Sequence, residues 1–178
     1  MRYRRTDIKG GSYFFTVNLD NRQSSLLIDE IDRLGDVIRR VKNRHPFQLD
    51  AIVVLPEHMH AIWTLPQGDS DYSTRWMLIK SAFSRQLPKT EHRSASKRKK
   101  GERGIWQRRY WEHLIRDEMD FQRHVDYIHF NPVKHGHAMR ASDWKYSSIH
   151  RFIANGLIDR FWGSQIELPE INGYGERQ

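Results

Sequence analysis

The fold of this chain is decided by the stretch LPEHMHAIWTL, which runs from Leu55 to Leu65. Its residues favour β structure, and Pro56 and Pro66 bound it at its two ends, so the pattern predicts a strand. Side chains alternate between the two faces of a strand. His58 and His60 therefore point to one face, and a set of apolar side chains points to the other.

The histidine pair has two interpretations. The Cα atoms of His58 and His60 lie about 6.5–7 Å apart on a strand, so both imidazoles can bind one metal ion. Such a pair is more often part of a half-exposed polar strand face that binds nothing. A third ligand and a reacting group elsewhere in the chain would favour the metal site.

The composition limits the classes of protein to consider. The chain has 178 residues, and we expect one domain, residues 1–178, with its own hydrophobic core. It has no cysteine, which excludes disulfides and thiolate metal sites. No apolar run approaches the roughly 20 residues of a membrane-spanning helix. The N-terminal residues MRYRRTD lack the apolar segment of a signal peptide, so we expect a cytoplasmic protein without a membrane partner.

The net charge of +8 is concentrated in one segment. Between Arg85 and Arg109 there are ten Lys and Arg residues and two acidic residues, so the rest of the chain is neutral overall. Such a localised positive charge attracts phosphate backbones. The alternative is a solvated loop without a partner. We expect residues 88–104 to be a basic, mobile loop, and the tail from about residue 161 has no usable periodicity.

Strands and helices alternate along the chain. Apolar patterns predict strands over residues 12–19, 47–55, 58–65 and 105–115, and helices over 28–41, 71–87, 117–130 and 142–156. The short Pro56-Glu57 connection suggests that the second and third strands form an antiparallel hairpin. This order predicts an α+β ferredoxin-like sandwich with a mainly antiparallel central sheet and helices packed on it. We place the histidine strand centrally, with its histidines facing helices.

The helix after Asp117 supplies candidates for the missing groups. Asp120, His124, Tyr127 and Asn131 are spaced by four, three and four residues, so they share one helical face. The amide oxygen of Asn131 can bind a hard cation, and Tyr127 lies one turn before it. The alternatives are a hydrogen-bonded aromatic residue at the core edge for Tyr127 and a helix-ending turn for Asn131. His124 is either a proton acceptor for Tyr127 or a surface polar residue.

Three motifs together resemble one known family. They are PEHMH at residues 56–60, GIWQRRYWEH at 104–113 and DYIHFNPVKHG at 126–136. In this order and at these intervals they resemble the REP-associated tyrosine transposases, which are single-tyrosine members of the HUH nuclease superfamily. The likeness extends from Gly10 to His150.

The resemblance implies a ferredoxin-like fold with the HUH motif on a central strand. It also implies a catalytic tyrosine at Tyr127 and a metal site formed by His58, His60 and Asn131. Hard oxygen ligands favour Mg²⁺ or Mn²⁺, and the two imidazoles favour Mn²⁺ somewhat. The ligands alone are also compatible with Zn²⁺.

The function implied is a metal-dependent endonuclease and strand transferase acting on single-stranded DNA that carries an imperfect REP hairpin. The reaction would pass through a 5′-phosphotyrosine intermediate, and we expect a monomer, with a dimer as the alternative. Candidate DNA-binding residues are Arg2, Arg4, Arg5, Arg85, Lys97, Arg98, Lys99, Lys100, Arg108 and Arg109. Trp106 and Tyr110 are either stacking partners for bases or core aromatics. The rival functions are a non-catalytic hairpin-binding protein and a phosphodiesterase that uses water.

Overall fold

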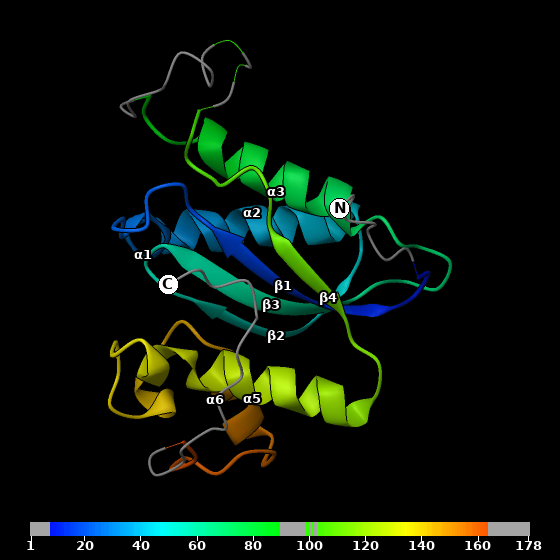
Figure 1. Ribbon diagram of the computed structural model, residues 1–178, viewed down its shortest axis with the longest axis vertical. Helices are drawn as coiled ribbons and strands as arrows, with labels where there is room; N and C mark the ends of the chain where they lie inside the picture. Colours follow the sequence, from blue (N-terminus) through cyan, green and yellow to red (C-terminus); the bar gives the residue numbers. More distant parts are fainter. Residues whose placement is uncertain (1–7, 90–98, 100, 102, 164–178) are drawn as a thin grey trace, which may run out of the picture.

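The four-stranded sheet is antiparallel throughout (Figure 1). The structure is a computed structural model that describes residues 8–89, 99, 101 and 103–163. The strands lie in the order β2-β3-β1-β4, so β3 is an interior strand, as predicted. Their bounds are Ser12–Asn18 for β1, Gln48–Val54 for β2, His58–Thr64 for β3 and Trp111–Leu114 for β4.

Helices cover both faces of the sheet (Figure 1). One face carries α2 (Ile31–Arg44) and α3 (Tyr72–Arg85), and the other carries α5 (Glu118–Lys134) with the short α6 (Ile149–Ala154). A single turn, α1 (Leu26–Asp29), precedes α2. The strand order and the helices between the strands give the expected ferredoxin-like α+β arrangement, to which α5 adds a further layer. None of the described helices is long and apolar enough to cross a membrane.

Side chains that alternate along β3 enter two separate apolar clusters, one on each face of the sheet. Met59, Ala61 and Trp63 belong to the large apolar cluster beneath α2 and α3. Ile62 belongs to a smaller cluster that includes Val125 of α5. Because His58 and His60 share the face of Ile62, they point toward α5, as the sequence pattern predicted.

Helix α5 continues four residues beyond the predicted end near Phe130. Its start is as predicted, because the Asp117 side chain accepts a hydrogen bond from the backbone N–H of Asp120 at 2.8 Å. The predicted helix end is therefore wrong, and Pro132 lies inside the helix. A proline in the last turn removes one hydrogen bond, and its buried ring packs in the interior. Asn131 is therefore a helical residue and does not end the helix.

The strand predicted over residues 105–115 is shorter in the structure. Only Trp111–Leu114 form β4, and Trp106 makes an isolated bridge to Leu19. Between the bridge and β4, the carbonyl oxygen of Gln107 accepts a hydrogen bond from the Lys80 ammonium at 3.0 Å. Burial lowers the pKa of Lys80 to about 8. Trp106 and Tyr110 pack against the larger core, which agrees with their interpretation as core aromatics.

The predicted fourth helix also begins later than expected, at Ile149. Residues 144–148 are not helical, because this segment pairs with β2. The N–H of Val54 donates to the carbonyl oxygen of Tyr146 at 2.9 Å, and the N–H of Ser148 donates to that of Ile52 at 2.8 Å. Gly156, with φ of 69°, follows the helix as its predicted stop.

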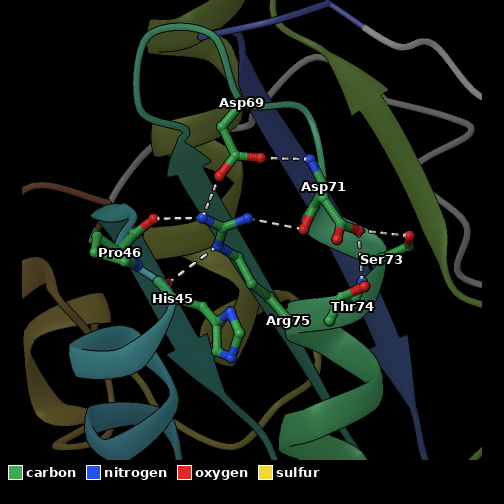
Figure 2. A network of polar contacts seen from close by, with 7 residues as sticks. All are labelled: His45, Pro46, Asp69, Asp71, Ser73, Thr74 and Arg75. Carbon is green, nitrogen blue, oxygen red and sulfur yellow. Dashed lines mark hydrogen bonds and ion pairs between the residues drawn. The ribbon is translucent and has the colours of Figure 1, made fainter.

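A buried arginine joins two connections of the chain, the one between α2 and β2 and the one between β3 and α3 (Figure 2). Arg75, 4% exposed, donates at 2.6 Å to the carboxylate of Asp69 in the loop after β3. Its other hydrogen bonds go to the carbonyl oxygens of His45 (3.1 Å), Pro46 (2.7 Å) and Asp71 (2.8 Å). The hydrogen bond from Arg75 lowers the pKa of Asp69. This network fixes the start of α3 against the end of α2.

Candidate active site

The structure brings the histidine pair and the candidate tyrosine together. The ring of Tyr127 lies 5.2 Å from that of His60, and the His60 ring lies 4.9 Å from that of His58 (centroid distances). Both histidines are fully buried, and Tyr127 is 3% exposed. The contact joins β3 to α5, two elements that are far apart in the sequence.

Asn131 lies on the helical face that carries Tyr127 and His135. The ring of His135, at the C-cap of α5, lies 5.2 Å from the ring of His58. Asn131 is four residues after Tyr127 and four before His135, so it occupies the intervening turn of the same helical face. Its side chain is fully buried. Tyr127 and the two histidines therefore meet between β3 and α5, and Asn131 is buried on the same face of α5 as Tyr127.

Two neighbouring residues orient the imidazoles. Glu57 Oε1 lies 2.8 Å from His58 Nδ1, and Thr16 Oγ1 lies 2.9 Å from His60 Nδ1. A carboxylate only accepts hydrogen bonds, so His58 Nδ1 donates, and in the neutral ring this leaves the lone pair on Nε2. Histidines that bind metals commonly donate their second ring nitrogen to a carboxylate in this way.

The donor set fits a divalent ion. His58 Nε2 and Asn131 Oδ1 are both buried atoms, and they would offer one nitrogen and one hard oxygen beside the second imidazole. Burial acts to raise the pKa of Glu57, but the hydrogen bond and charge of His58 and the charge of Arg22 outweigh it. The pKa is lowered overall, so Glu57 is ionised at neutral pH and holds His58 in the tautomer that a metal requires.

A second group of residues could also hold a metal ion. One ligand atom from each of His113, Asp120 and His124 lies within 4.8 Å of the others, the only such group of His, Asp and Glu among the described residues. His113 Nε2 lies 2.8 Å from one carboxylate oxygen of Asp120, and His124 Nδ1 lies 3.1 Å from the other. The sequence pattern placed Asp120 and His124 on one face of α5. It gave no sign of His113, which β4 contributes.

The second group adjoins the first through one aromatic ring. The ring of Phe14 lies 4.8 Å from that of His124, 5.5 Å from that of His60 and 6.0 Å from that of Tyr127. Burial lowers the pKa of His124, which favours its neutral form. His124 is a buried residue, so its interpretation as a surface polar residue is wrong.

Two residues near the tyrosine were missed in the sequence. Lys134 Nζ lies 3.0 Å from the Tyr127 hydroxyl oxygen, and His135 lies beside His58. Both were identifiable from spacing. Lys134 is seven residues, or two helical turns, after Tyr127, and His135 is one turn after Asn131. The expected helix end at Phe130 concealed this relationship.

The candidate DNA-binding residues fall into two sets. Six of them lie outside the described residues: Arg2, Arg4, Arg5, Lys97, Arg98 and Lys100. The other four are exposed: Arg85, Lys99, Arg108 and Arg109. The N–H of Gln107 donates to the carbonyl oxygen of Asn18 at 3.0 Å, and Asn18 pairs with His58. Arg108 and Arg109 therefore lie at the same end of the sheet as the histidine pair.

A ferredoxin-like sheet whose central strand carries two histidines opposite a tyrosine-bearing helix is typical of the single-tyrosine transposases of the HUH superfamily. No family model matches the chain. A REP-associated tyrosine transposase of Escherichia coli K12 is 48% identical over 164 residues, 92% of this chain and 92% of that protein. A Haemophilus influenzae relative is 44% identical over 167 residues, 93% of this chain and 95% of that protein. The chain belongs to the family of REP-associated tyrosine transposases.

A solved structure agrees with this assignment. It shows a REP-associated tyrosine transposase bound to a REP hairpin, with 46% sequence identity and a TM-score of 0.83. The match covers 100% of this chain and 98% of that chain. The family and the α+β fold that the motifs implied are thereby confirmed.

Proposed function

We propose that this chain is a metal-dependent single-stranded DNA endonuclease and strand transferase acting at REP hairpins. The observation that carries the proposal is the 5.2 Å contact between the rings of Tyr127 and His60. It brings a nucleophile from α5 to the histidine pair of β3. A buried hydroxyl beside two imidazoles and an amide has the composition of a phosphoryl-transfer site.

His58, His60 and Asn131 would hold the divalent ion. Bound Mg²⁺ or Mn²⁺ supplies a Lewis acid for a non-bridging phosphate oxygen. Glu57 and Thr16 keep the two imidazoles in place, because each contacts an Nδ1 atom. The fixed helical spacing between Tyr127 and Asn131 sets the nucleophile relative to the ligand.

The reaction is an exchange of esters. A bond forms between Tyr127 Oη and phosphorus while the bond from phosphorus to the 3′ oxygen breaks. The phenol proton passes to water, and the departing 3′ oxygen takes a proton from water. The products are a strand held as a 5′-phosphotyrosine and a free 3′-hydroxyl, which can reverse the step on another strand.

The substrate class follows from the family. The 46% identical relative is bound to a REP hairpin in its solved structure, and we propose the same class of ligand for this chain. Arg108 and Arg109 would contact backbone phosphates, because they are exposed at the histidine end of the sheet. Arg85, Lys99 and the basic residues outside the described part would extend this contact.

A covalent-adduct assay tests the proposal. A labelled single strand with a REP hairpin is incubated with protein and Mn²⁺, and the products are separated under denaturing conditions. We expect label on the protein, its loss with EDTA, and its loss in Tyr127→Phe with hairpin binding retained. Tyr146→Phe is the matched control, since Tyr146 packs outside the site.

The other outcomes identify the rival functions. Cleavage without a protein-bound strand would identify a phosphodiesterase that uses water. Hairpin binding without cleavage in any divalent metal would identify a binding protein. Either result would exclude the proposed nucleophile.

A further inference from the structure

An ammonium group lies against the candidate nucleophile. Lys134 Nζ is 3.0 Å from the Tyr127 hydroxyl oxygen and 4.7 Å from the centre of its ring. The Tyr127 side chain is buried, whereas Lys134 is exposed. The ammonium has no acceptor function, so the hydroxyl oxygen accepts this hydrogen bond.

The helix makes this contact possible. Seven residues correspond to a rise of about 10.5 Å along α5, and side chains on a helix lean toward its N-terminus. The Lys134 side chain therefore reaches back along the same face to Tyr127. Had the helix ended at Phe130, Lys134 would have lain in a turn without a fixed direction. The continuation of α5 through Pro132 is what aligns the two residues.

We propose that Lys134 is a catalytic residue that stabilises negative charge on Tyr127 Oη in both directions of strand transfer. This inference rests on the proposed role of Tyr127 as nucleophile. In cleavage, the ammonium donates to the oxygen as that oxygen loses its proton to water and bonds to phosphorus. Lys134 keeps its own proton throughout.

The reverse step needs the same group. When a 3′-hydroxyl attacks the phosphotyrosine, a new bond from the 3′ oxygen to phosphorus forms and the bond from phosphorus to Oη breaks. Tyr127 leaves with the electron pair, and an adjacent ammonium stabilises that charge. The phenolate then recovers a proton from water, which balances the proton released by the attacking hydroxyl.

Kinetics of the two steps test the proposal. Adduct formation is measured with a hairpin strand in Mn²⁺, and adduct resolution is measured after adding a strand with a free 3′-hydroxyl. In Lys134→Met we expect both rate constants to fall about tenfold at saturating protein, the size expected for one charge-assisted hydrogen bond. Hairpin affinity should change less than twofold, and Lys134→Arg should restore part of both rates.

The chain offers a matched control. Lys145 Nζ lies 4.8 Å from the centre of the Tyr146 ring, nearly the same cation–ring distance as in the Lys134 pair but outside the site. Lys145→Met should therefore leave both rates unchanged. Equal reductions of the rate constants in Lys134→Met and Lys145→Met would overturn the proposal. They would show that the rates depend on the overall positive charge and not on the position of Lys134.

Two further results would separate the possible failures. If Lys134→Met weakens binding and regains the wild-type rates at saturation, Lys134 is a backbone-phosphate contact and the proposal is wrong. If Tyr127→Phe is inactive while Lys134→Met reacts at the wild-type rates, only the role of Lys134 fails. If Tyr127→Phe still forms the adduct, the nucleophile is another residue and both proposals fail.

Discussion

Glu57 binds His58 Nδ1 at 2.8 Å, so the residue immediately before the first histidine determines the direction in which its second nitrogen points. The contact joins two consecutive residues of the chain. Arg22, at 3.6 Å from the Glu57 carboxylate, supports its ionised form. The orientation of one metal-binding candidate is therefore encoded locally.

Replacing this carboxylate should weaken metal binding. We expect Glu57→Gln to raise the Mn²⁺ concentration needed for half-maximal cleavage by about tenfold, because partners that orient ligating histidines typically contribute 10- to 100-fold to affinity. A metal titration of adduct formation measures this. The control is Glu118→Gln, an exposed residue in the first turn of α5. Equal metal requirements in both variants would show that Glu57 does not tune the site.

The two groups of possible metal ligands can be separated by substitution. We expect His60→Ala to abolish metal-dependent cleavage, because it removes an imidazole beside Tyr127. His113→Gln should keep the metal requirement of the wild-type protein, since His113 belongs to the group around Asp120. Cleavage assays across Mn²⁺ concentrations distinguish them. Loss of the metal response in His113→Gln alone would assign the catalytic ion to the second group.

Neutralising the arginines before β4 should weaken DNA binding across sequences. In the double variant Arg108→Gln and Arg109→Gln, we expect affinity for the hairpin to fall and the slope of log affinity against log salt to decrease by one to two. Binding isotherms at several salt concentrations measure both. Arg39→Gln and Arg40→Gln, exposed on α2, provide a control of equal charge. An unchanged salt dependence in the Arg108/Arg109 double variant would show that these two arginines do not contact the DNA backbone.

A buried histidine should make the fold sensitive to acid. Burial, together with the charges of Arg151 and His150, lowers the pKa of His129 to about 3, against about 6.5 in an unfolded chain. The unfolded state therefore binds more protons between these values. The contribution of neutral His129 to the free energy of unfolding is fully present above pH 6.5. It falls by up to about 1.4 kcal/mol per pH unit as the pH drops toward 3.

Chemical denaturation at several pH values tests this expectation. His129→Gln keeps a hydrogen-bonding group for Ser148, which lies 3.0 Å from His129 Nε2, but it cannot titrate. Its unfolding free energy should depend less on pH between 4 and 6.5 than that of the wild-type protein. His45→Gln, an exposed histidine at the C-cap of α2, should behave like the wild-type protein. Parallel curves for His129→Gln and wild type would contradict the assignment.

Removal of the buried arginine should destabilise the whole fold. Arg75→Met leaves the Asp69 carboxylate and three carbonyl oxygens without their shared donor (Figure 2). We expect the free energy of unfolding to fall by about 3 kcal/mol, as when one partner of a buried ion pair is removed. Denaturant titration measures it, with Arg39→Met as the exposed control. A loss below about 0.5 kcal/mol would mean that water replaces the network.

Local patterns in the sequence predicted most of the sheet and the core of the site. The alternation of side chains around Met59 placed His58 and His60 on one face of a strand. The four-residue spacing of Tyr127 and Asn131 placed them on one face of a helix. These are consequences of strand and helix periodicity, so they can be found in a single sequence. The motifs added the expectation that the two segments meet.

Tertiary contacts determined what the sequence patterns missed. The later start of α6 depends on hydrogen bonds between residues 146–148 and β2, which no local pattern reveals. The extension of α5 depends on packing that tolerates Pro132, and it is the extension that brings Lys134 to Tyr127. His113 joins Asp120 and His124 only because β4 pairs with β1.

The pairing of residues 146–148 with β2 has a further consequence for self-association. Exposed strand edges are templates on which further strands add, from a second copy or in aggregates. Along β2 the chain satisfies that template with its own backbone at Val54 and Ile52. The other outer strand of the sheet is β4, which spans only four residues. Among the described residues, strand addition is thus blocked at the Ile52–Val54 end of β2, and the short β4 edge lies beside the group formed by His113, Asp120 and His124.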